Sequence, residues 1–327
     1  MDDTKHPPLV APDFMDKSFK WILKRALKNN IASEPVSIKS LASEQFYMKI
    51  LVVGDCHGVK QELENEAEQA DVILAVGDIC GDSEEMREAM FQAMDLEKEW
   101  YDILGRGNAR KAVENSLERG RKVLKQLNSF NKPVFIVPGN WDWDGREETW
   151  GFLAENRFQD LIDEFPNIQN INRERFQDSN FCYIGYGPCS APEIPQYEDE
   201  KPEKEEEIQE IKAEYLRKTD KLQELFQEAE KPVIFLSHNV PHETSLDRIQ
   251  NPESPADGRH YGSLIVREMI EEFSPIFSAA GHMHEGYGRE QVGETLALNA
   301  GLHSHVLMEL ENEEVKKIDF HPSREDY

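Results

Sequence analysis

The sequence predicts an α/β fold, and three patterns along the chain lead to that prediction. Five short apolar runs lack the polar alternation of half-exposed strands, so they suit strands that are buried on both faces. Longer segments rich in Glu, Lys, Ala and Leu separate these runs and suit helices. From about residue 285 onward, apolar and polar residues alternate, which is typical of antiparallel strands, with turns expected at Gly293 and near Asn312.

The first segment, residues 1–45, is expected to be a helical extension outside the main domain. Pro7, Pro8 and Pro12 break regular structure near the start. Beyond them, apolar side chains such as Phe19 and Leu23 recur at helical spacing and are interleaved with lysines. A helix packed on the domain explains this pattern, and a contact with a partner or with nucleic acid is the alternative.

The five buried strands are expected over residues 49–53, 72–76, 134–137, 233–236 and 276–279. Each is followed by a turn with a polar side chain, and most of these turns carry a glycine that lets backbone segments approach closely. In open α/β sheets, ligands bind just beyond the carboxyl ends of the strands. These turns are therefore where a functional site is expected.

Three segments between the strands predict helices. Residues 84–130 suit two helices, interrupted near Gly105 and Gly107, that form a cap or brace. Residues 147–165 predict a further helix. Residues 198–230 begin with a run of acidic residues and continue with an apolar stripe at helical spacing. A solvated surface helix is the expected role of this last segment, and a partner-binding arm is the alternative.

Charge and cysteine content restrict the function classes. The 327 residues include 37 Lys and Arg and 64 Asp and Glu, which gives a formal net charge of −27. Such a chain repels nucleic acid and anionic membranes, so general duplex nucleic-acid binding is unfavourable. No apolar run reaches the roughly 18–20 residues that span a bilayer. The 4 cysteines lack disulfide-type spacing and no signal-peptide pattern is evident, so we expect reduced thiols and a cytoplasmic location.

The polar residues that follow the five strands are of metal-ligating types. They are Asp55, His57, Asp78, Asn140, His238, His282 and His284. Carboxylate, amide and imidazole donors suit hard to borderline divalent cations. One catalytic ion needs fewer ligands than these seven residues offer. The extra ligands could hold a second ion, with one carboxylate shared by the two ions. Two ions about 3.5–4 Å apart clamp both oxygens of a phosphoryl displacement. A single motif such as Asp55-x-His57 or His282-x-His284 is a weak signal by itself. Because all seven residues follow predicted strands, together they indicate one dinuclear site.

Five motifs carry a family resemblance: GDCHG, GDICGD, GNWD, SHNVPH and GHMH. In this order they resemble the calcineurin-like metallophosphoesterase superfamily, and the stretch GRHYGSLIVREMIEEFSPIFSAAGHMHEG is similar to its small prokaryotic members. The resemblance covers roughly residues 48–310 and implies a four-layer α-β-β-α sandwich with mixed sheets. We therefore expect a metallophosphoesterase domain over 46–320, with helical insertions at about 84–130 and 198–230, and a tail at 321–327.

The resemblance also implies a role for each of the seven residues. The first ion would be held by Asp55, His57 and His284, the second by Asn140, His238 and His282, and both by Asp78. A hydroxide between the two ions would attack phosphorus in line. Mn, Fe, Zn, Ni or Co occupy such sites in families of this kind, and the sequence does not choose among them.

One position departs from the family pattern. Much of the family has a His after the Asn, where it assists the leaving group, and here that position is Trp141. Indole donates one N–H and cannot shuttle a proton. A metal-bound water, His242 or His260 could replace it, so the two histidines are catalytic candidates; the alternative is a structural or loop role for each. Trp141 and Trp143 either stack on a substrate ring or pack in the core.

Three further residues near the motifs could be mistaken for ligands. Asp82 is expected to cap the helix that follows it. Asp142 is expected to orient a metal ligand through a hydrogen bond. Cys56, between Asp55 and His57, is expected to be a packed thiol.

Taken with the resemblance, the sequence predicts a metal-dependent hydrolase of phosphoric esters that acts on a small phosphodiester or nucleotide-like molecule. A phosphomonoesterase is an alternative within the same chemistry. A scaffold that keeps the fold without turnover is a second alternative, which the complete set of donors argues against. A DNA nuclease is a third, which the acidic charge makes unfavourable. The sequence does not determine the oligomeric state, and a homo-oligomer is compatible with it.

Overall fold

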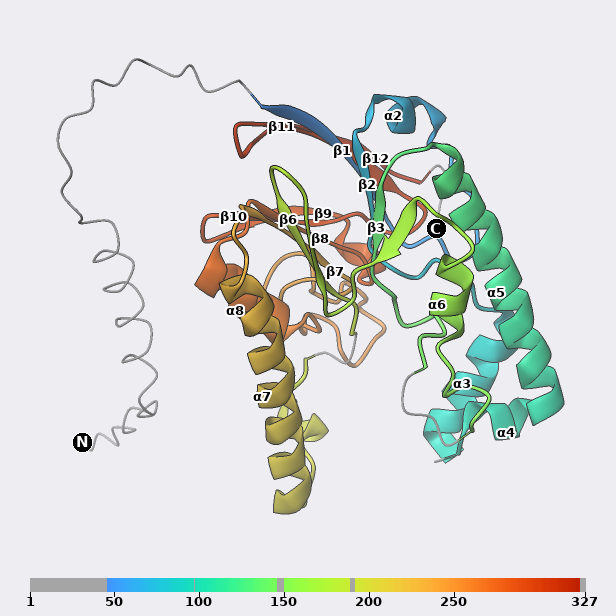
Figure 1. The fold of residues 1–327 in the computed structure, drawn as a ribbon. Coiled ribbons are helices and arrows are strands. Elements are labelled where there is room, and N and C mark those ends of the chain that lie inside the picture. The colour runs from blue at the N-terminus through green and yellow to red at the C-terminus, as the bar shows by residue number, and fades with distance from the viewer. Residues whose placement is uncertain (1–45, 97, 146–149, 189–191, 324–327) are drawn as a thin grey trace, which may run out of the picture. The chain divides into compact units, whose positions relative to one another are not determined.

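Two mixed β-sheets form the centre of the fold (Figure 1). The computed structural model describes residues 46–96, 98–145, 150–188 and 192–323. The predicted extension at 1–45, Cys189 and the end of the predicted tail, 324–327, lie outside the described residues. Each sheet contains 6 strands and helices flank both sheets, so the α/β prediction is confirmed.

The first sheet has the strand order β12-β11-β1-β2-β3-β4. Strands β1 to β4 run parallel, and β11 and β12 continue the sheet in antiparallel pairing. The strands are β1 (Tyr47–Val53), β2 (Val72–Ala75), β3 (Val134–Ile136), β4 (Ile168–Asn170), β11 (His305–Glu311) and β12 (Glu314–His321). Because β1, β2 and β3 are parallel, their carboxyl ends meet at one edge.

The second sheet has the strand order β5-β6-β7-β8-β10-β9. Strands β6, β7, β8 and β10 run parallel, and antiparallel β5 and β9 form the edges. The strands are β5 (Arg175–Gln177), β6 (Cys182–Tyr186), β7 (Val233–Ser237), β8 (Phe277–Ala280), β9 (Gly288–Val292) and β10 (Thr295–Asn299). The adjacent strands β7 and β8 therefore also end side by side.

Three hydrophobic clusters define the layers. In the cluster between the sheets, Val52 and Leu74 of the first sheet pack with Leu236 and Ala279 of the second. The other face of the first sheet packs on α2, α5 and α6, and that of the second on α7 and α8 (Figure 1). These helices are α2 (Glu64–Gln69), α5 (Arg106–Ser129), α6 (Arg157–Ile162), α7 (Glu205–Gln227) and α8 (Leu264–Phe273). This is the predicted four-layer α-β-β-α sandwich.

The insertion between β2 and β3 contains three helices rather than the expected two. They are α3 (Glu84–Leu96), α4 (Trp100–Leu104) and α5. Gly105 lies between α4 and α5 with φ of 80°, a conformation that favours glycine, so the chain turns there. The insertion has its own hydrophobic cluster, in which Tyr101 and Val113 pack with Leu153.

The helix predicted over 147–165 is largely wrong. Residues 150–155 form turns and bends, and the helix α6 begins only at Arg157; residues 146–149 lie outside the described part of the chain. The side chain of Asn156 accepts a hydrogen bond of 2.9 Å from the Gln159 N–H, which caps the helix at this point. Leu153 instead packs into the cluster of the insertion, so tertiary contacts override the helical pattern.

The remaining elements predicted within the described residues are present. The β9–β10 turn contains Gly293 and the β11–β12 turn contains Asn312, both with positive φ. Helix α7 buries Leu222 and Phe226 against the second sheet, and its first turn is acidic and largely exposed, as expected of a surface helix. Among the described residues, no helix is both long enough and apolar enough to cross a membrane.

Candidate metal centre

The seven residues predicted as ligands all lie in turns that follow β1, β2, β3, β7 and β8. Parallel pairing aligns the ends of β1, β2 and β3 in one sheet and those of β7 and β8 in the other. Three of the residues, His57, Asp78 and His282, have φ between 44° and 66°. Such left-handed backbone is unfavourable for residues other than glycine and concentrates at functional sites.

The first group consists of Asp55, His57 and His284. Each offers a ligand atom that lies within 4.8 Å of the other two. The His284 Nε2 atom is 3.4 Å from the Asp55 Oδ2 atom, and the rings of His57 and His284 meet edge to face at 5.2 Å. Asp55 is fully buried and His57 is half-buried, whereas His284 is exposed, so a cation there would be open to solvent on the side of His284.

The second group consists of Asp78, His238 and His282, whose ligand atoms also lie within 4.8 Å of one another. The amide of Asn140 joins it: one terminal atom lies 2.9 Å from His238 Nε2 and 3.0 Å from His282 Nδ1. An amide nitrogen at this position would donate hydrogen bonds to the two rings, and an amide oxygen would share a cation with them. The other nitrogen of His238, Nδ1, is 2.8 Å from the Val76 carbonyl, which fixes the ring orientation.

Asp78 lies between the two groups. Its Oδ2 atom is 3.6 Å from His57 Nε2 in the first group and 3.5 Å from His238 Nε2 in the second. Its Oδ1 atom accepts a hydrogen bond of 2.8 Å from the Trp141 backbone N–H. One carboxylate oxygen therefore faces an imidazole from each group, which is the position required of a bridging ligand.

The protonation of Asp78 and the unsatisfied atoms around it are compatible with bound cations. Burial acts to raise the pKa of Asp78, but the adjacent His238 and His57 rings outweigh it and hold that pKa well below its ordinary value. Among the described residues, Asp55 Oδ1 and His57 Nε2 are buried without a hydrogen-bond partner. Buried polar groups of this kind are costly unless they are paired or coordinate a metal. The donors present therefore fit the divalent ions that the resemblance implies.

Two glycines allow the turns to approach the candidate ligands. A Cβ atom on Gly281 would lie 2.2 Å from Asp55 Oδ1, and one on Gly139 would lie 2.2 Å from Asp78 Oδ1. Real Cβ contacts do not occur at such distances, so a larger residue at either position would displace a carboxylate. The glycines thus serve close approach rather than flexibility.

Asp142 ties two of the turns together. Its carboxylate accepts hydrogen bonds of 2.9 Å from the backbone N–H groups of Gly139 and Cys80. Burial and the nearby Asp78 raise the pKa of Asp142 to about 6. The orienting contact is therefore to the backbone beside Asn140 and Asp78, and not to a ligand side chain. Cys56 is buried, and burial raises the pKa of its thiol, in keeping with a packed thiol.

The expectation for Asp82 is wrong. The Oγ atom of Ser83, and not Asp82, accepts a hydrogen bond from the Met86 N–H at the start of α3. Asp82 instead pairs with Arg87 at 2.6 Å and has an oxygen 3.8 Å from His57 Nδ1. It therefore lies beside the metal centre on the outer side of His57.

Arg119 was not identified from the sequence. Its guanidinium donates hydrogen bonds to the backbone carbonyls of His57, at 2.6 Å, and Asp82, at 2.7 Å. It belongs to α5, more than 60 residues away from His57 along the chain. No local pattern distinguishes it from the other basic residues of this helix, so only the fold reveals the contact.

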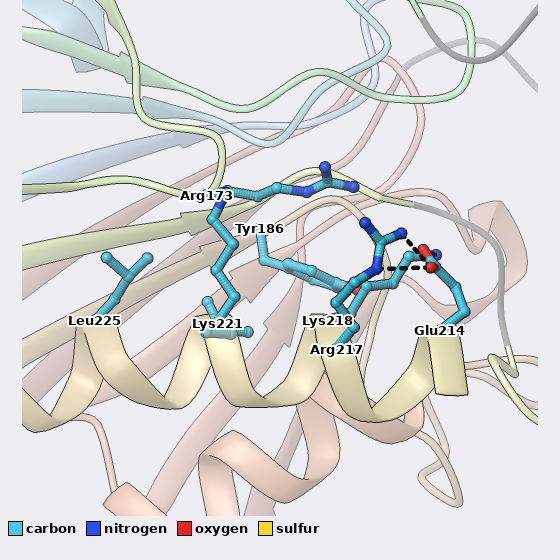
Figure 2. Close-up of a pocket in the computed structure, with 8 residues that line it drawn as sticks. Arg173, Tyr186, Glu214, Arg217, Lys218, Lys221 and Leu225 are labelled. Atoms are coloured by element: carbon cyan, nitrogen blue, oxygen red, sulfur yellow. Dashed lines mark hydrogen bonds and ion pairs between the residues drawn. The ribbon is translucent and has the colours of Figure 1, made fainter. Parts of the chain in front are cut away.

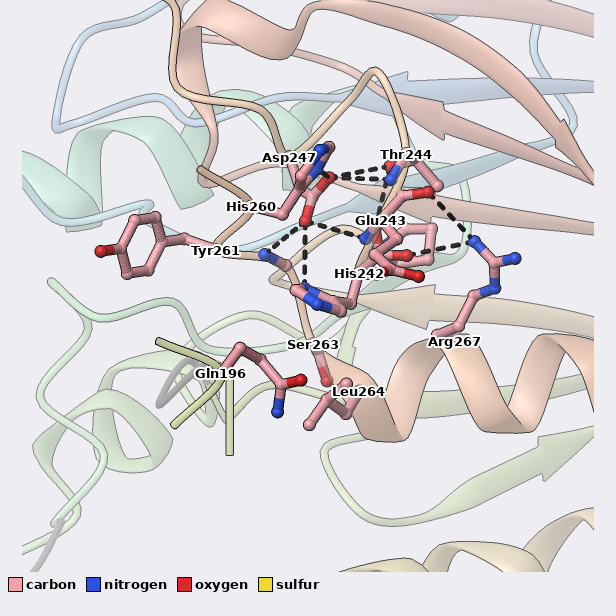
Figure 3. Close-up of polar contacts among 12 residues, drawn as sticks. Gln196, His242, Glu243, Thr244, Asp247, His260, Tyr261, Ser263, Leu264 and Arg267 are labelled. Carbon is pink, nitrogen blue, oxygen red and sulfur yellow. Dashed lines mark hydrogen bonds and ion pairs between the residues drawn. The ribbon is translucent and has the colours of Figure 1, made fainter. Parts of the chain in front are cut away.

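His242 and His260 lie together around a buried carboxylate, Asp247, which sequence reasoning also missed (Figure 3). The Asp247 oxygens are 2.6 Å from His260 Nδ1 and 3.3 Å from His242 Nδ1. They also accept backbone hydrogen bonds of 2.9 Å from Thr244 and Gly262. Burial acts to raise the pKa of Asp247, but the two histidines and these donors lower it overall. Neither histidine belongs to the two metal-ligating groups.

The two tryptophans of the GNWDW segment pack against the helical insertion. Trp143 donates a hydrogen bond of 2.9 Å to Ser116 Oγ, and its ring centroid is 6.2 Å from that of Trp100. Trp141 packs against the same cluster while its backbone contacts Asp78. These contacts agree with the core-packing alternative for Trp143, and they couple the insertion to the metal centre.

Of two cavities in the described part of the chain, one adjoins the candidate site and the other does not. One of about 90 Å³ lies beside α7 and is lined by basic side chains that include Arg173, Lys218 and Lys221 (Figure 2). The other, of about 330 Å³, lies between the loop after β2 and helices α4 and α5, and its lining includes Asp82 and Arg119. None of the seven candidate ligands lines either cavity. The second cavity adjoins the metal centre through Asp82, whereas the first shares no residue with it.

Sequence comparison agrees with this arrangement. The family model described as calcineurin-like phosphoesterase matches residues 48–286. An uncharacterized protein of Methanocaldococcus jannaschii, MJ1162, is 24% identical over 283 residues, which cover 84% of this chain and 97% of that protein.

One of two similar solved structures supports the fold, with a TM-score above 0.5. One crystal structure, 18% identical to this chain, aligns over 85% of this chain and 100% of its own chain with a TM-score of 0.56. The crystal structure of TT1561 of Thermus thermophilus is 14% identical and aligns over 84% of this chain and 99% of its own, with a TM-score of 0.42. Because the family model matches well over half of the sequence, the chain belongs to the calcineurin-like phosphoesterase family.

Proposed function

We propose that this chain is a phosphoester hydrolase with a dinuclear centre of divalent metal ions. The ligands would be Asp55, His57, Asp78, Asn140, His238, His282 and His284. The observation that carries the proposal is the position of Asp78, whose Oδ2 atom faces His57 Nε2 at 3.6 Å and His238 Nε2 at 3.5 Å. A carboxylate oxygen shared between two histidine-containing groups is what two neighbouring cations require.

The ions and the protein have separate tasks in this proposal. When bound, the two ions would lower the pKa of a water molecule and withdraw charge from the phosphoryl oxygens. The protein fixes the ligands: Asp142 holds the backbone at Gly139, and Arg119 holds that at His57. Oxygen and imidazole donors suit Mn, Fe, Zn, Ni or Co, and the donor set does not distinguish among them.

The leaving group requires a proton donor, because Trp141 replaces the usual histidine. We assign this task to the pair of His242 and His260. Asp247 supports the assignment, since a buried carboxylate 2.6 Å from His260 Nδ1 orients that ring. A metal-bound water is the alternative, and it would make the rate independent of both histidines.

A small phosphodiester or nucleotide-like molecule is the substrate class that we propose. The cavity beside Asp82 has a volume of about 330 Å³, within the range of small-molecule pockets. Its lining includes Asn108, Asn115 and Lys111, which offer hydrogen bonds to a base or sugar and a positive charge to a phosphate. A phosphomonoester remains the alternative substrate. The net charge of −27 disfavours long nucleic acids.

The experiment that tests this function compares bis-p-nitrophenyl phosphate with p-nitrophenyl phosphate, each with Mn, Ni, Co, Zn or Mg added to chelator-treated protein. We expect metal-dependent turnover, with the diester preferred. Asn140→Ala should abolish most of this rate, and Asn65→Ala, at an exposed position of α2, should leave it unchanged. An undiminished rate in Asn140→Ala would contradict the ligand assignment. A preference for the monoester would indicate a phosphomonoesterase, and absence of turnover with every metal would favour a scaffold.

A cytoplasmic location remains a prediction, and so does the compatibility of the chain with a homo-oligomer. Cys56, Cys80 and Cys182 are buried free thiols, which is compatible with a reducing compartment such as the cytoplasm. Fractionation of the native host and light scattering of the purified chain would test the two points.

A further inference from the structure

A second cluster of metal-ligating side chains lies outside the candidate centre. Glu66 on α2, His305 at the start of β11 and His321 at the end of β12 each offer a ligand atom within 4.8 Å of the other two. Two histidines and one carboxylate are a donor set typical of zinc and related ions. None of the three belongs to the motifs that predicted the dinuclear centre.

The distances within this cluster fit a cation better than direct hydrogen bonds. His305 Nε2 is 3.6 Å from one Glu66 oxygen, and His321 Nδ1 is 3.8 Å from the other. Both distances are too long for hydrogen bonds. Ligands about 2.0–2.1 Å from a tetrahedral ion lie about 3.3 Å apart, so small side-chain rotations would bring these atoms into coordination.

One nitrogen of each ring in the cluster lacks a hydrogen bond. Among the described residues, the Nε2 atoms of His305 and His321 are buried and make no hydrogen bond. The His305 residue is only 8% exposed. Leaving a buried imidazole nitrogen without a hydrogen bond is unfavourable, and an ion shared with Glu66 would remove that penalty at His305 Nε2.

The fold itself brings the two histidines together. His305 and His321 are directly paired in the antiparallel β11–β12 register, and their rings stack at 4.7 Å with an angle of 6°. Cross-strand neighbours in such a pair lie on the same face of the sheet. Glu66 belongs to α2, the helix that covers this face of the first sheet. Its neighbour Ala67 packs into the hydrophobic cluster between α2 and the sheet.

We propose that Glu66, His305 and His321 form a third metal site, for a borderline divalent ion of the zinc class, with water completing its coordination. The site is structural: it joins α2 to the ends of β11 and β12. When the ion binds, the two rings must tilt away from their parallel stacking, because parallel rings 4.7 Å apart cannot both direct a nitrogen at one ion.

The proposed site would also brace the loop that carries Asp55. The N–H of Gly54 donates to the carbonyl of Ser304, next to His305, and the N–H of Asp55 donates to the carbonyl of Gly301. Helix α2 follows this same loop in the chain. An ion that fixes both α2 and the start of β11 would therefore stabilise the loop from two sides.

The test counts metal ions and measures stability. Chelator-treated full-length protein is incubated with stoichiometric Zn²⁺, passed through a desalting column and analysed by elemental mass spectrometry. We expect Glu66→Gln and His305→Asn each to bind one ion per chain fewer than the wild type. Glu68→Gln, at an exposed position of the same helix, is the matched control and should bind as many as the wild type. Zn²⁺ should raise the melting temperature of Glu68→Gln more than that of Glu66→Gln.

A crystal of the wild-type chain grown with Zn²⁺ gives a readout that does not depend on variants. Anomalous density between the two histidine rings would support the site, and its absence alongside density at the other ligands would overturn the inference. Equal metal counts in Glu66→Gln and Glu68→Gln would overturn it as well. These outcomes are separable from the proposed function, because Asn140→Ala should lose metal-dependent turnover while retaining the ion bound by Glu66.

Discussion

The guanidinium of Arg119 donates a hydrogen bond of 2.6 Å to the backbone carbonyl of His57. The contact joins α5, in the helical insertion, to the turn that carries two of the candidate ligands. A second bond, of 2.7 Å, reaches the carbonyl of Asp82 in the loop after β2. The insertion is thus not only a cap: one of its side chains fixes the backbone on the outer side of His57.

Replacing Arg119 should weaken metal binding without unfolding the protein. In Arg119→Met, the aliphatic part of the side chain is kept but both hydrogen bonds to the turns are lost. Groups that support metal ligands typically contribute 10–100-fold in affinity, so we expect a loss of about that size. Competition with a coloured chelator measures it. Arg110→Met removes an exposed ion pair with Glu114 and a contact with the Phe152 ring, neither of which involves a ligand-bearing turn, so it should bind metal like the wild type. Equal affinities in the two variants would contradict the role of Arg119.

A pair of glycine substitutions tests how tightly the turns are packed. In Gly281→Ala, the new Cβ atom would lie 2.2 Å from Asp55 Oδ1, so the carboxylate or the turn must move. We expect a loss of metal and a fall in the free energy of unfolding of about 1–3 kcal/mol. In Gly107→Ala, no atom lies within 4 Å of the new Cβ, so this variant should be stabilised by about 0.5 kcal/mol. Urea unfolding and metal analysis measure both. A Gly281→Ala protein with full metal content would show that Asp55 is not a ligand.

Much of the candidate site could be predicted because its residues share a local pattern. Each of the seven follows a buried strand, as Asp78 follows β2 and His238 follows β7. Parallel pairing then brings separated turns to one edge of a sheet, so strand order is enough to place them near one another. The bounds of these strands differ from the predicted bounds by at most two residues, so this argument still holds.

The supporting residues could not be predicted, because their contacts depend on tertiary structure. Asp247 is one of 64 acidic residues, and nothing near it in the sequence marks it as the partner of His260. Arg119 looks like any basic residue of an amphipathic helix. The false helix at 147–165 has the same origin: Leu153 satisfies a helical pattern but is held by the cluster of the insertion. For Asp82, the adjacent Ser83 supplied the cap instead, one residue later in the chain.

The proposed leaving-group acid predicts a dependence on the leaving group. General acids contribute about 10²–10⁴-fold, and only where the leaving oxygen needs protonation. We therefore expect His260→Asn to lower kcat for a phenyl or alkyl ester by this order and to affect a p-nitrophenyl ester far less. Asp247→Asn should act in the same direction, because it removes the charge that orients His260.

Comparison of the two histidines distinguishes the alternatives. If His242→Asn shows the selective loss and His260→Asn does not, His242 is the donor. Glu253→Gln, at an exposed position of the same loop, is the control and should leave both substrates unaffected. An equal loss for good and poor leaving groups would indicate that the histidines merely support the loop.

A partly buried carboxylate at the start of α8, that of Glu193, predicts a pH-dependent stability. Glu193 accepts hydrogen bonds from Ser263 Oγ and, at 2.8 Å, from the Leu264 N–H. These donors lower the pKa of Glu193, but burial raises it by more, so the pKa lies above its ordinary value. The folded chain therefore holds this proton more tightly than the unfolded chain does. Stability is highest below the unfolded pKa of about 4.3 and falls as the pH rises from there through the folded pKa.

Glu193→Gln should remove this dependence. Glutamine stays neutral at every pH, so the free energy of unfolding of the variant minus that of the wild type should increase as the pH rises from 4 towards 7. Each unit by which the folded pKa is raised corresponds to about 1.4 kcal/mol of this increase. Urea unfolding of chelator-treated protein measures the difference at each pH without a contribution from bound metal. Glu198→Gln, whose wild-type side chain is 90% exposed, is the control and should differ from the wild type by the same amount at every pH. If the Glu193→Gln difference is likewise constant between pH 4 and 7, then Ser263 and Leu264 stabilise the ionised carboxylate enough to cancel its burial, and the pKa of Glu193 is not raised.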